Sequence, residues 1–118
     1  MDMDCVFCKI AHGVIKAKSV IAGNPELERY FDMNATVAIY DIAPQAPTHV
    51  VVFGKEHITA VDYGRVIGEL FRAAQFLTTR VLNLPSYRLV TNIGPDAGQQ
   101  VMHVHVHILG GKPLGPIG

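Results

Sequence analysis

Three histidines alternate with apolar residues near the C-terminus of this 118-residue chain, at His103, His105 and His107. Alternation predicts a β-strand, here over residues 101–109, because successive side chains of a strand point to opposite faces. Neighbours on one face lie about 6.7 Å apart, so the imidazoles should form a row roughly 13 Å long. Burying imidazoles without partners is costly, and we therefore expect the row to face a cleft. The opposite, apolar face would consist of Met102, Val104, Val106 and Ile108.

Three interpretations of the histidine row compete. It could be an exposed strand without function, but three histidines in front of an unbroken apolar face argue against that. Two neighbouring imidazoles could share a zinc ion, whereas all three could reach one ion only with distortion. We favour the third interpretation, phosphate chemistry, in which a neutral imidazole attacks phosphorus while flanking histidines hold the phosphate oxygens. The glycine-rich loop at residues 94–98 could add backbone N–H donors.

The helices that must position this row are expected at two places. A short helix is predicted over residues 5–12, with Asp4 at its start and Gly13 at its end. A long helix is predicted over residues 60–82, where apolar residues recur at spacings of three and four.

The strands are expected around these two helices. Besides the histidine strand, the pattern predicts strands over residues 18–22, 28–32, 36–41, 49–53 and 86–93. The first two would flank a turn at Gly23, Asn24 and Pro25. We therefore predict a single α+β domain over residues 1–118, built on an antiparallel sheet with one long helix and a short N-terminal helix.

The composition excludes several classes of function. Ten basic residues balance ten acidic ones, without a basic run, so a nucleic-acid polymer is not an expected partner. No apolar run is long enough to span a membrane, and the N-terminus lacks the features of a signal peptide. We expect a soluble cytoplasmic protein, with a nuclear location also open in a eukaryote.

Two cysteines form a Cys-x-x-Cys pair at Cys5 and Cys8. A structural disulfide is not expected without a secretion signal. A redox pair of the thioredoxin type needs a preceding strand, for which four residues leave no room. The spacing suits a structural zinc site, and the alternative is a pair of reduced thiols.

Residues 103–109 resemble the His-φ-His-φ-His-φ-φ motif (φ apolar) of the histidine-triad superfamily of nucleotide hydrolases and transferases. Residues 41–49, residues 92–94 and the ending at residues 109–116 are also similar to that family. The Gly-Gly pair after the triad resembles the Hint branch (histidine-triad nucleotide-binding proteins) rather than the fragile-histidine-triad branch. A third histidine instead of glutamine argues against the nucleotidyltransferase branch.

The resemblance implies a fold and a reaction. Members are homodimers that share a sheet across the interface and bind a purine nucleoside monophosphate at the triad strand. The branch hydrolyses the P–N bond of purine nucleoside phosphoramidates through a nucleotidyl-histidine intermediate, without a cofactor. Two alternatives stay open: a nucleotide- or zinc-binding interaction module with incidental catalysis, and a dinucleoside polyphosphate hydrolase.

The resemblance also assigns roles to individual residues. His105 would attack the α-phosphorus while a backbone carbonyl holds its other ring nitrogen, and His103 and His49 would orient it. His107 and Asn92 would contact phosphate oxygens, and Asp41 would accept from the ribose hydroxyls. Many relatives carry Gly-Gln-Ser near the leaving group. This chain has Gly98 followed by Gln99 and Gln100, and these two glutamines would contact the nucleotide. The purine slot would be lined by Val6, Phe7, Ile10, Ile39 and Ile42.

The resemblance also implies a zinc site, because some relatives bind zinc at the corresponding positions. Here the ligands would be Cys5, Cys8, His49 and His103, and the ion would lie beside the nucleophile without replacing it. The two remaining histidines, His12 and His57, are expected at the surface, with a structural place near the entry of the long helix as the alternative for His57.

Overall fold

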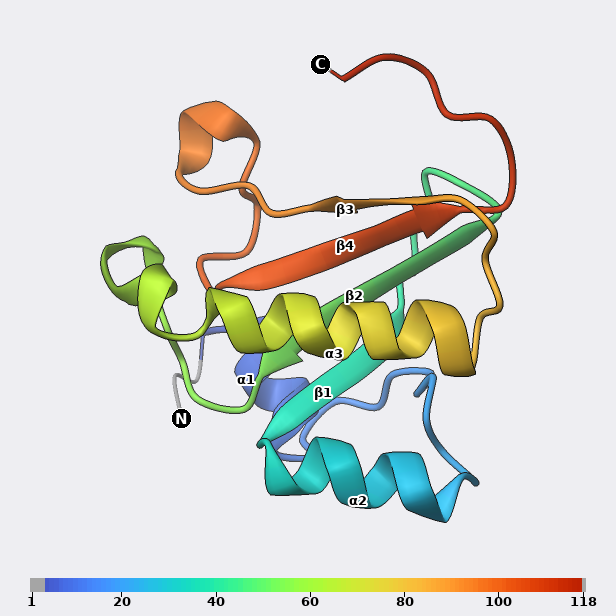
Figure 1. Ribbon diagram of the computed structural model, residues 1–118. Coiled ribbons are helices and arrows are strands. Elements are labelled where there is room, and N and C mark those ends of the chain that lie inside the picture. Colours follow the sequence, from blue (N-terminus) through green and yellow to red (C-terminus); the bar gives the residue numbers. More distant parts are fainter. Residues whose placement is uncertain (1–3, 118) are drawn as a thin grey trace.

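Four antiparallel strands form one sheet in the computed structural model, which describes residues 4–117. The strands are β1 (Thr36–Tyr40), β2 (Thr48–Gly54), β3 (Tyr87–Val90) and β4 (His105–Gly110), in the spatial order β1-β2-β4-β3 (Figure 1). All neighbouring pairs are antiparallel. The predicted α+β class with an antiparallel sheet is confirmed.

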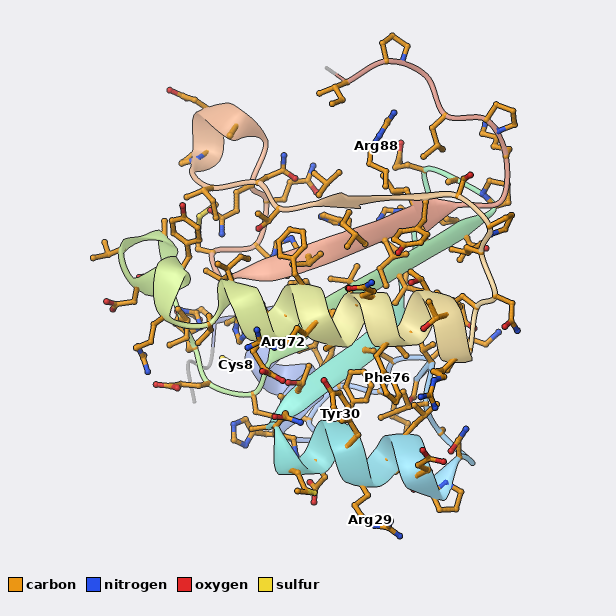
Figure 2. All side chains as sticks on the ribbon, viewed as in Figure 1. Cys8, Arg29, Tyr30, Arg72, Phe76 and Arg88 are labelled. Carbon is orange, nitrogen blue, oxygen red and sulfur yellow. The ribbon has the colours of Figure 1, made fainter. Side chains whose placement is uncertain are left out.

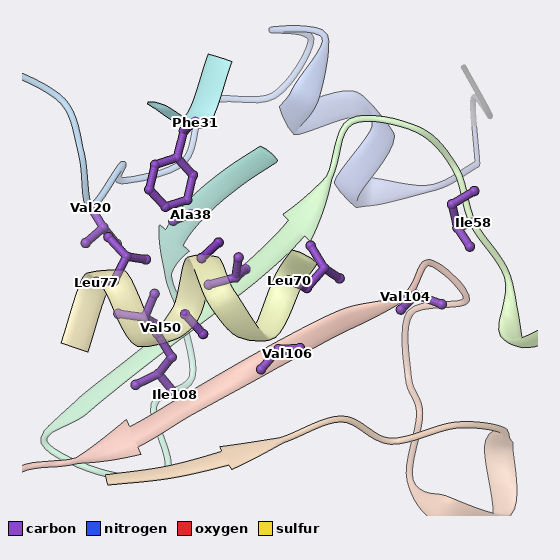
Figure 3. Close-up of a cluster of buried hydrophobic side chains, with 13 residues drawn as sticks. Val20, Phe31, Ala38, Val50, Ile58, Leu70, Leu77, Val104, Val106 and Ile108 are labelled. Carbon is purple, nitrogen blue, oxygen red and sulfur yellow. The ribbon is translucent and has the colours of Figure 1, made fainter. Parts of the chain in front are cut away.

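One face of the sheet packs against the long helix α3 (Ile67–Arg80), which lies across it in Figure 1. Alternate residues of β2 and β4 are fully buried against that helix, as the two-residue period of a strand requires. Figure 3 shows this cluster, which includes Val50, Val52, Val106, Ile108, Leu70 and Leu77. The apolar half of the predicted alternation is correct for its last three members. Met102 is 44% exposed and does not belong to it.

The other face of the sheet carries the short helix α1 (Val6–Ala11) and the histidines of β4. Phe7 of α1 stacks on Phe53 of β2, with ring centroids 4.3 Å apart. In the β2–β4 register, Phe53 lies opposite His105 and Val51 lies opposite His107. The sheet therefore separates an apolar core under α3 from a second face that carries α1 and the histidines of β4.

Helix α2 (Pro25–Met33) lies where the sequence interpretation placed a turn and a strand. The predicted strand over residues 28–32 is wrong, and residues 18–22 make only an isolated bridge between Ser19 and Ile39. The Asn24 side chain accepts a hydrogen bond from the Leu27 N–H, and Pro25 occupies the first turn. Asparagine before proline is a strong helix start, which was mistaken here for a turn between strands.

Helix α2 is fixed to α3 by aromatic stacking. Tyr30 and Phe76 lie nearly parallel, 4.7 Å apart between centroids, where Figure 2 shows the two helices side by side. The guanidinium of Arg80 lies 4.9 Å from the centroid of the Phe76 ring. The stacking of Tyr30 on Phe76 therefore holds α2 against α3.

The remaining helix boundaries differ from the predictions in detail. The predicted helix over residues 60–82 divides into a 3₁₀ segment (Ala60–Arg65) and α3. Helix α1 starts from Cys5, not Asp4, because the Cys5 sulfur accepts from the Cys8 N–H. A second 3₁₀ turn (Pro95–Ala97) lies in the glycine-rich loop. Among the described residues, no helix combines the length and apolarity needed to cross a membrane.

The histidine strand is shorter than predicted, because β4 begins at His105. The chain turns just before it, where the His103 N–H donates to the Val101 carbonyl at 2.8 Å. The Val104 N–H bonds to the Ile58 carbonyl instead of joining the ladder. His103 is therefore set apart from the other two histidines of the row.

Candidate active site

A cavity of about 800 Å³ opens between α1, residues 15–17 and the α1-facing side of the sheet. It is lined at one end by His105, His107 and His49, and Asp41 also lines it. Other predicted site residues that line it are Val6, Phe7, Ile10, Ile39, Ile42 and Gln100. The predicted apolar slot and the histidines thus share one cleft.

His105 presents an unprotonated nitrogen to this cavity. Its Nδ1 lies 2.7 Å from the carbonyl oxygen of His103, which can only accept, so Nδ1 carries the proton and donates. In the neutral ring, Nε2 then keeps its lone pair. Burial lowers the pKa of His105, opposed by the bond to the His103 carbonyl, and favours this neutral form. The residue has the tautomer that a nucleophile requires.

His107 takes the opposite tautomer because of a chain of hydrogen bonds. The Gln45 N–H donates to Nδ1 of His49 at 3.0 Å, so the neutral His49 carries its proton on Nε2. This Nε2–H lies 2.9 Å from Nδ1 of His107 and 3.5 Å from Oδ2 of Asp41. His107 therefore accepts at Nδ1 and holds its own proton on Nε2. The Nε2 lone pair thus belongs to His105 and the Nε2–H donor to His107, two neighbouring rings whose centroids lie 4.9 Å apart.

Burial keeps His107 neutral well below physiological pH. It lowers the pKa of His107 to about 4, with help from the neighbouring His105 and His49 and against the Asp41 charge. Burial likewise lowers the pKa of His49, and Asp41 opposes the shift. Near neutral pH, both rings act as hydrogen-bonding groups rather than as cations.

The shift of His107 predicts acid sensitivity of the fold. Between pH 6.5 and about 4, the unfolded chain binds a proton at this position that the folded chain rejects, so the free energy of unfolding should fall as the pH is lowered through that window. His107→Gln should lose less stability over the same window. Urea unfolding at pH 7.0, 5.5 and 4.5 checks this, with His12→Gln, an exposed site, as the control. Equal losses in native protein and His107→Gln would contradict it.

The side chain of His103 belongs to a second cluster, behind the cavity. It is fully buried, and its Nε2 donates to the Gly54 carbonyl at 2.7 Å, which leaves Nδ1 unprotonated. That Nδ1 lies 3.3 Å from the Cys5 sulfur and 3.6 Å from the Cys8 sulfur. The hydrogen bond of His103 to His105 thus comes from its backbone carbonyl and not from its ring.

The fourth member of this cluster is His57, whose Nδ1 lies 3.3 Å from the Cys8 sulfur. Ligand atoms of Cys5, Cys8, His57 and His103 all lie within 4.8 Å of one another. The predicted fourth ligand, His49, lies instead with Asp41 and His107. The ligand set implied by the resemblance is therefore corrected by one residue. His49 points into the cavity from the start of β2, whereas His57 follows the end of the same strand and reaches α1.

Two predicted nucleotide contacts do not line the cavity. The Asn92 side chain donates to the Ala97 carbonyl at 2.8 Å and holds the glycine-rich loop. Gln99 is buried, accepts from the Gly94 N–H and donates to the Val101 carbonyl. Both side chains stabilise the glycine-rich loop through these bonds instead of lining the cavity.

The sequence interpretation also missed residues that line the cavity. Ile15, Lys16 and Ala17 form part of its wall because the chain folds back after α1, where the Lys9 carbonyl accepts from Val14 and Ile15. Gly13 permits this reversal with φ +75°, and its position at the end of a helix was the only available signal.

Comparison with known proteins gives consistent results. A sequence model of the HIT domain matches residues 26–114. A HIT-like protein of Chlamydia pneumoniae is 36% identical over 112 residues, which cover 85% of this chain and 96% of that protein. The purine nucleoside phosphoramidase of Escherichia coli K12 is 36% identical over 86 residues, 68% of this chain and 72% of that enzyme.

Solved structures show the same likeness. A histidine triad protein from Clostridium difficile superposes with a TM-score of 0.82 at 29% identity, covering 100% of this chain and 99% of that one. A HIT family hydrolase from Clostridium thermocellum gives a TM-score of 0.79 at 34% identity, covering 99% and 98%. The structural likeness thus extends over nearly the whole chain.

Proposed function

The chain belongs to the HIT family and resembles its hydrolases, and from that premise we propose that it cleaves the P–N bond of purine nucleoside phosphoramidates. The observation that carries the proposal is the pair of opposite tautomers on β4. A bare Nε2 on His105 stands beside an Nε2–H on His107 in a cleft with an apolar slot. A nucleophile next to a donor for phosphoryl oxygen is the arrangement that nucleotidyl transfer needs.

The reaction would run in two displacements. His105 Nε2 attacks the α-phosphorus, and the P–N bond breaks as a proton from solvent water reaches the amine nitrogen, so that the amine leaves neutral. Water then attacks the phosphorus of the nucleotidyl-histidine and loses a proton to solvent, the N–P bond breaks, and the nucleoside monophosphate is released. The His107 N–H stabilises the charge on the phosphoryl oxygens in both steps.

The nucleotide would lie along the cavity. Asp41 presents Oδ2 at the cavity while its Oδ1 accepts from the Ala43 N–H at 2.8 Å, which fixes the carboxylate as an acceptor for ribose hydroxyls. Ile10 of α1 and Ile39 of β1 offer apolar walls on which a purine can stack. In this orientation, the base lies far from the histidines and the phosphate against them.

Two substrates separate the proposed activity from its nearest alternative. The native protein should hydrolyse an adenosine phosphoramidate at least about tenfold more efficiently, in kcat/KM, than a diadenosine polyphosphate. Release of AMP from each substrate is measured side by side by chromatography. The opposite ranking would identify a dinucleoside polyphosphate hydrolase. Nucleotide binding without turnover of either substrate would leave only a binding module.

We also propose that Cys5, Cys8, His57 and His103 hold a structural zinc ion. Ligand atoms at 2.0–2.3 Å from a tetrahedral zinc lie roughly 3.3–3.8 Å apart, because the ion sits at their centre. The sulfur–nitrogen distances of 3.3, 3.3 and 3.6 Å fit that requirement. Burial raises the pKa of the Cys5 thiol, and a bound cation would offset this by stabilising the thiolate.

The chain would work as a cytoplasmic homodimer that shares its sheet across the interface. Strand β3 supports this, because it lies at the edge of the sheet and pairs only with β4 within the described residues. An unpaired strand edge is a surface on which a second copy can add. The balanced charge gives no support for a nucleic-acid polymer as a partner.

A further inference from the structure

The cavity is lined by one lysine, Lys16, which lies in the segment that follows α1. Among its lining residues in the described part of the chain, only Lys16 and Asp41 carry a formal charge. The Asp41 carboxylate accepts from the Ala43 N–H and lies 3.5 Å from Nε2 of His49. Lys16 therefore supplies the cationic contact of the cavity, which the proposed reaction chemistry leaves unused.

The sheet order places Lys16 far from the phosphate position. Residues 18–20 run beside the outer edge of β1, where the Tyr40 N–H bonds to the Lys18 carbonyl and the Val20 N–H to the Ala38 carbonyl. From β4 across β2 and β1 to this segment there are three strand spacings, roughly 14 Å. A nucleotide with its phosphorus at His105 would thus extend its base, not its phosphate, toward Lys16.

Apolar side chains line the same cavity as Lys16. They include Ile10, Ile15 and Ile39. Apolar walls bind any purine face without distinguishing adenine from guanine. A side chain at the base edge is then what can select among purines.

We propose that Lys16 selects 6-oxopurine nucleotides, those of guanine and hypoxanthine, over adenine nucleotides. A lysine ammonium has three donors and no acceptor. Guanine and hypoxanthine present two adjacent acceptors, O6 and N7, whereas adenine replaces O6 with an amino donor. The Lys16 ammonium can donate to both O6 and N7 of a 6-oxopurine, whereas beside adenine it can donate only to N7 and lies next to the amino donor. This inference rests on the proposed nucleotide site and specifies its substrate class.

Equilibrium binding of product nucleotides tests the role of Lys16 without turnover. We expect GMP and IMP to bind the native protein about tenfold more tightly than AMP in isothermal titration calorimetry. Because IMP lacks the 2-amino group, equal preference for GMP and IMP assigns the effect to O6 and N7. In Lys16→Met the three dissociation constants should become nearly equal, and Lys16→Arg should restore the preference.

A neighbouring lysine provides the matched control. Lys18 does not line the cavity, and its Nζ lies 5.0 Å from the centroid of the Tyr40 ring, so Lys18→Met should keep the native preference. A uniform weakening of all three nucleotides in Lys16→Met would overturn the proposal, because it would place the ammonium on the phosphate. Native protein without a preference would also overturn it, while absence of any nucleotide binding would refute the nucleotide site itself.

Discussion

His105→Ala should lower kcat/KM for an adenosine phosphoramidate by at least about a hundredfold. The substitution removes the Nε2 lone pair and leaves the apolar slot and the His49–His107 bond in place. Steady-state release of the amine from a fluorogenic substrate measures the loss. Because ground-state contacts remain, the change should appear mainly in kcat.

The exposed His12 provides the control for this substitution. His12→Ala should retain native turnover, which shows that removing a histidine alone is not the cause. Acid quenching of the native reaction and mass spectrometry should find the nucleotidyl group on the peptide with His105, and not in His105→Ala. Full activity of His105→Ala would refute the nucleophilic mechanism, and an adduct on His107 would reassign the nucleophile.

The sequence predicts correctly the part of the site that lies within strand β4. Alternation through His105, Val106 and His107 correctly predicts which side chains enter the core and which meet the cleft. The same alternation continues back to His103, where it fails, because the Val104 N–H bonds to the Ile58 carbonyl. A hydrogen bond to a residue distant in the sequence leaves no local signal, and the strand start could not be predicted.

The separation of His49 from the cysteines has a similar cause. His49 and His57 lie near opposite ends of β2, and the sequence interpretation placed His49 with the cysteines and His57 at the surface. Which of them meets the cysteines depends on where α1 packs along the sheet. The stacking of Phe7 on Phe53 sets α1 at the His57 end. That choice is made by tertiary packing, whereas the Cys-x-x-Cys spacing is visible in the sequence.

His103 connects the two clusters, which gives the proposed zinc a mechanistic consequence. Its ring belongs to the Cys5–Cys8–His57 cluster, and its carbonyl accepts the Nδ1–H of His105 at 2.7 Å. A ligand bond on the ring would restrict the backbone that holds the nucleophile in its tautomer. His103 is fully buried. Water from the solvent therefore cannot replace the metal as a partner of its ring when the metal is removed.

His57→Ala should abolish the binding of one zinc ion per chain and lower the melting temperature by roughly 10 °C. A ligand present at a hundred times its dissociation constant stabilises a fold by about 2.7 kcal/mol, and 1 kcal/mol corresponds to roughly 3–5 °C in a domain of this size. Metal content by plasma mass spectrometry and melting by circular dichroism measure both effects. Chelation of native protein should reproduce the loss of stability.

His49→Ala is the matched variant, because it removes the same side chain from the ligand position first predicted. It should keep the zinc and its contribution to the melting temperature, since His49 lies with Asp41 and His107 instead of the cysteines. It should instead reduce turnover, because His107 loses the donor that fixes its tautomer. Zinc lost from His49→Ala and kept in His57→Ala would restore the original ligand set. Native protein without zinc would leave Cys5 and Cys8 as a pair of reduced thiols, in which His57 serves only as a hydrogen-bond partner.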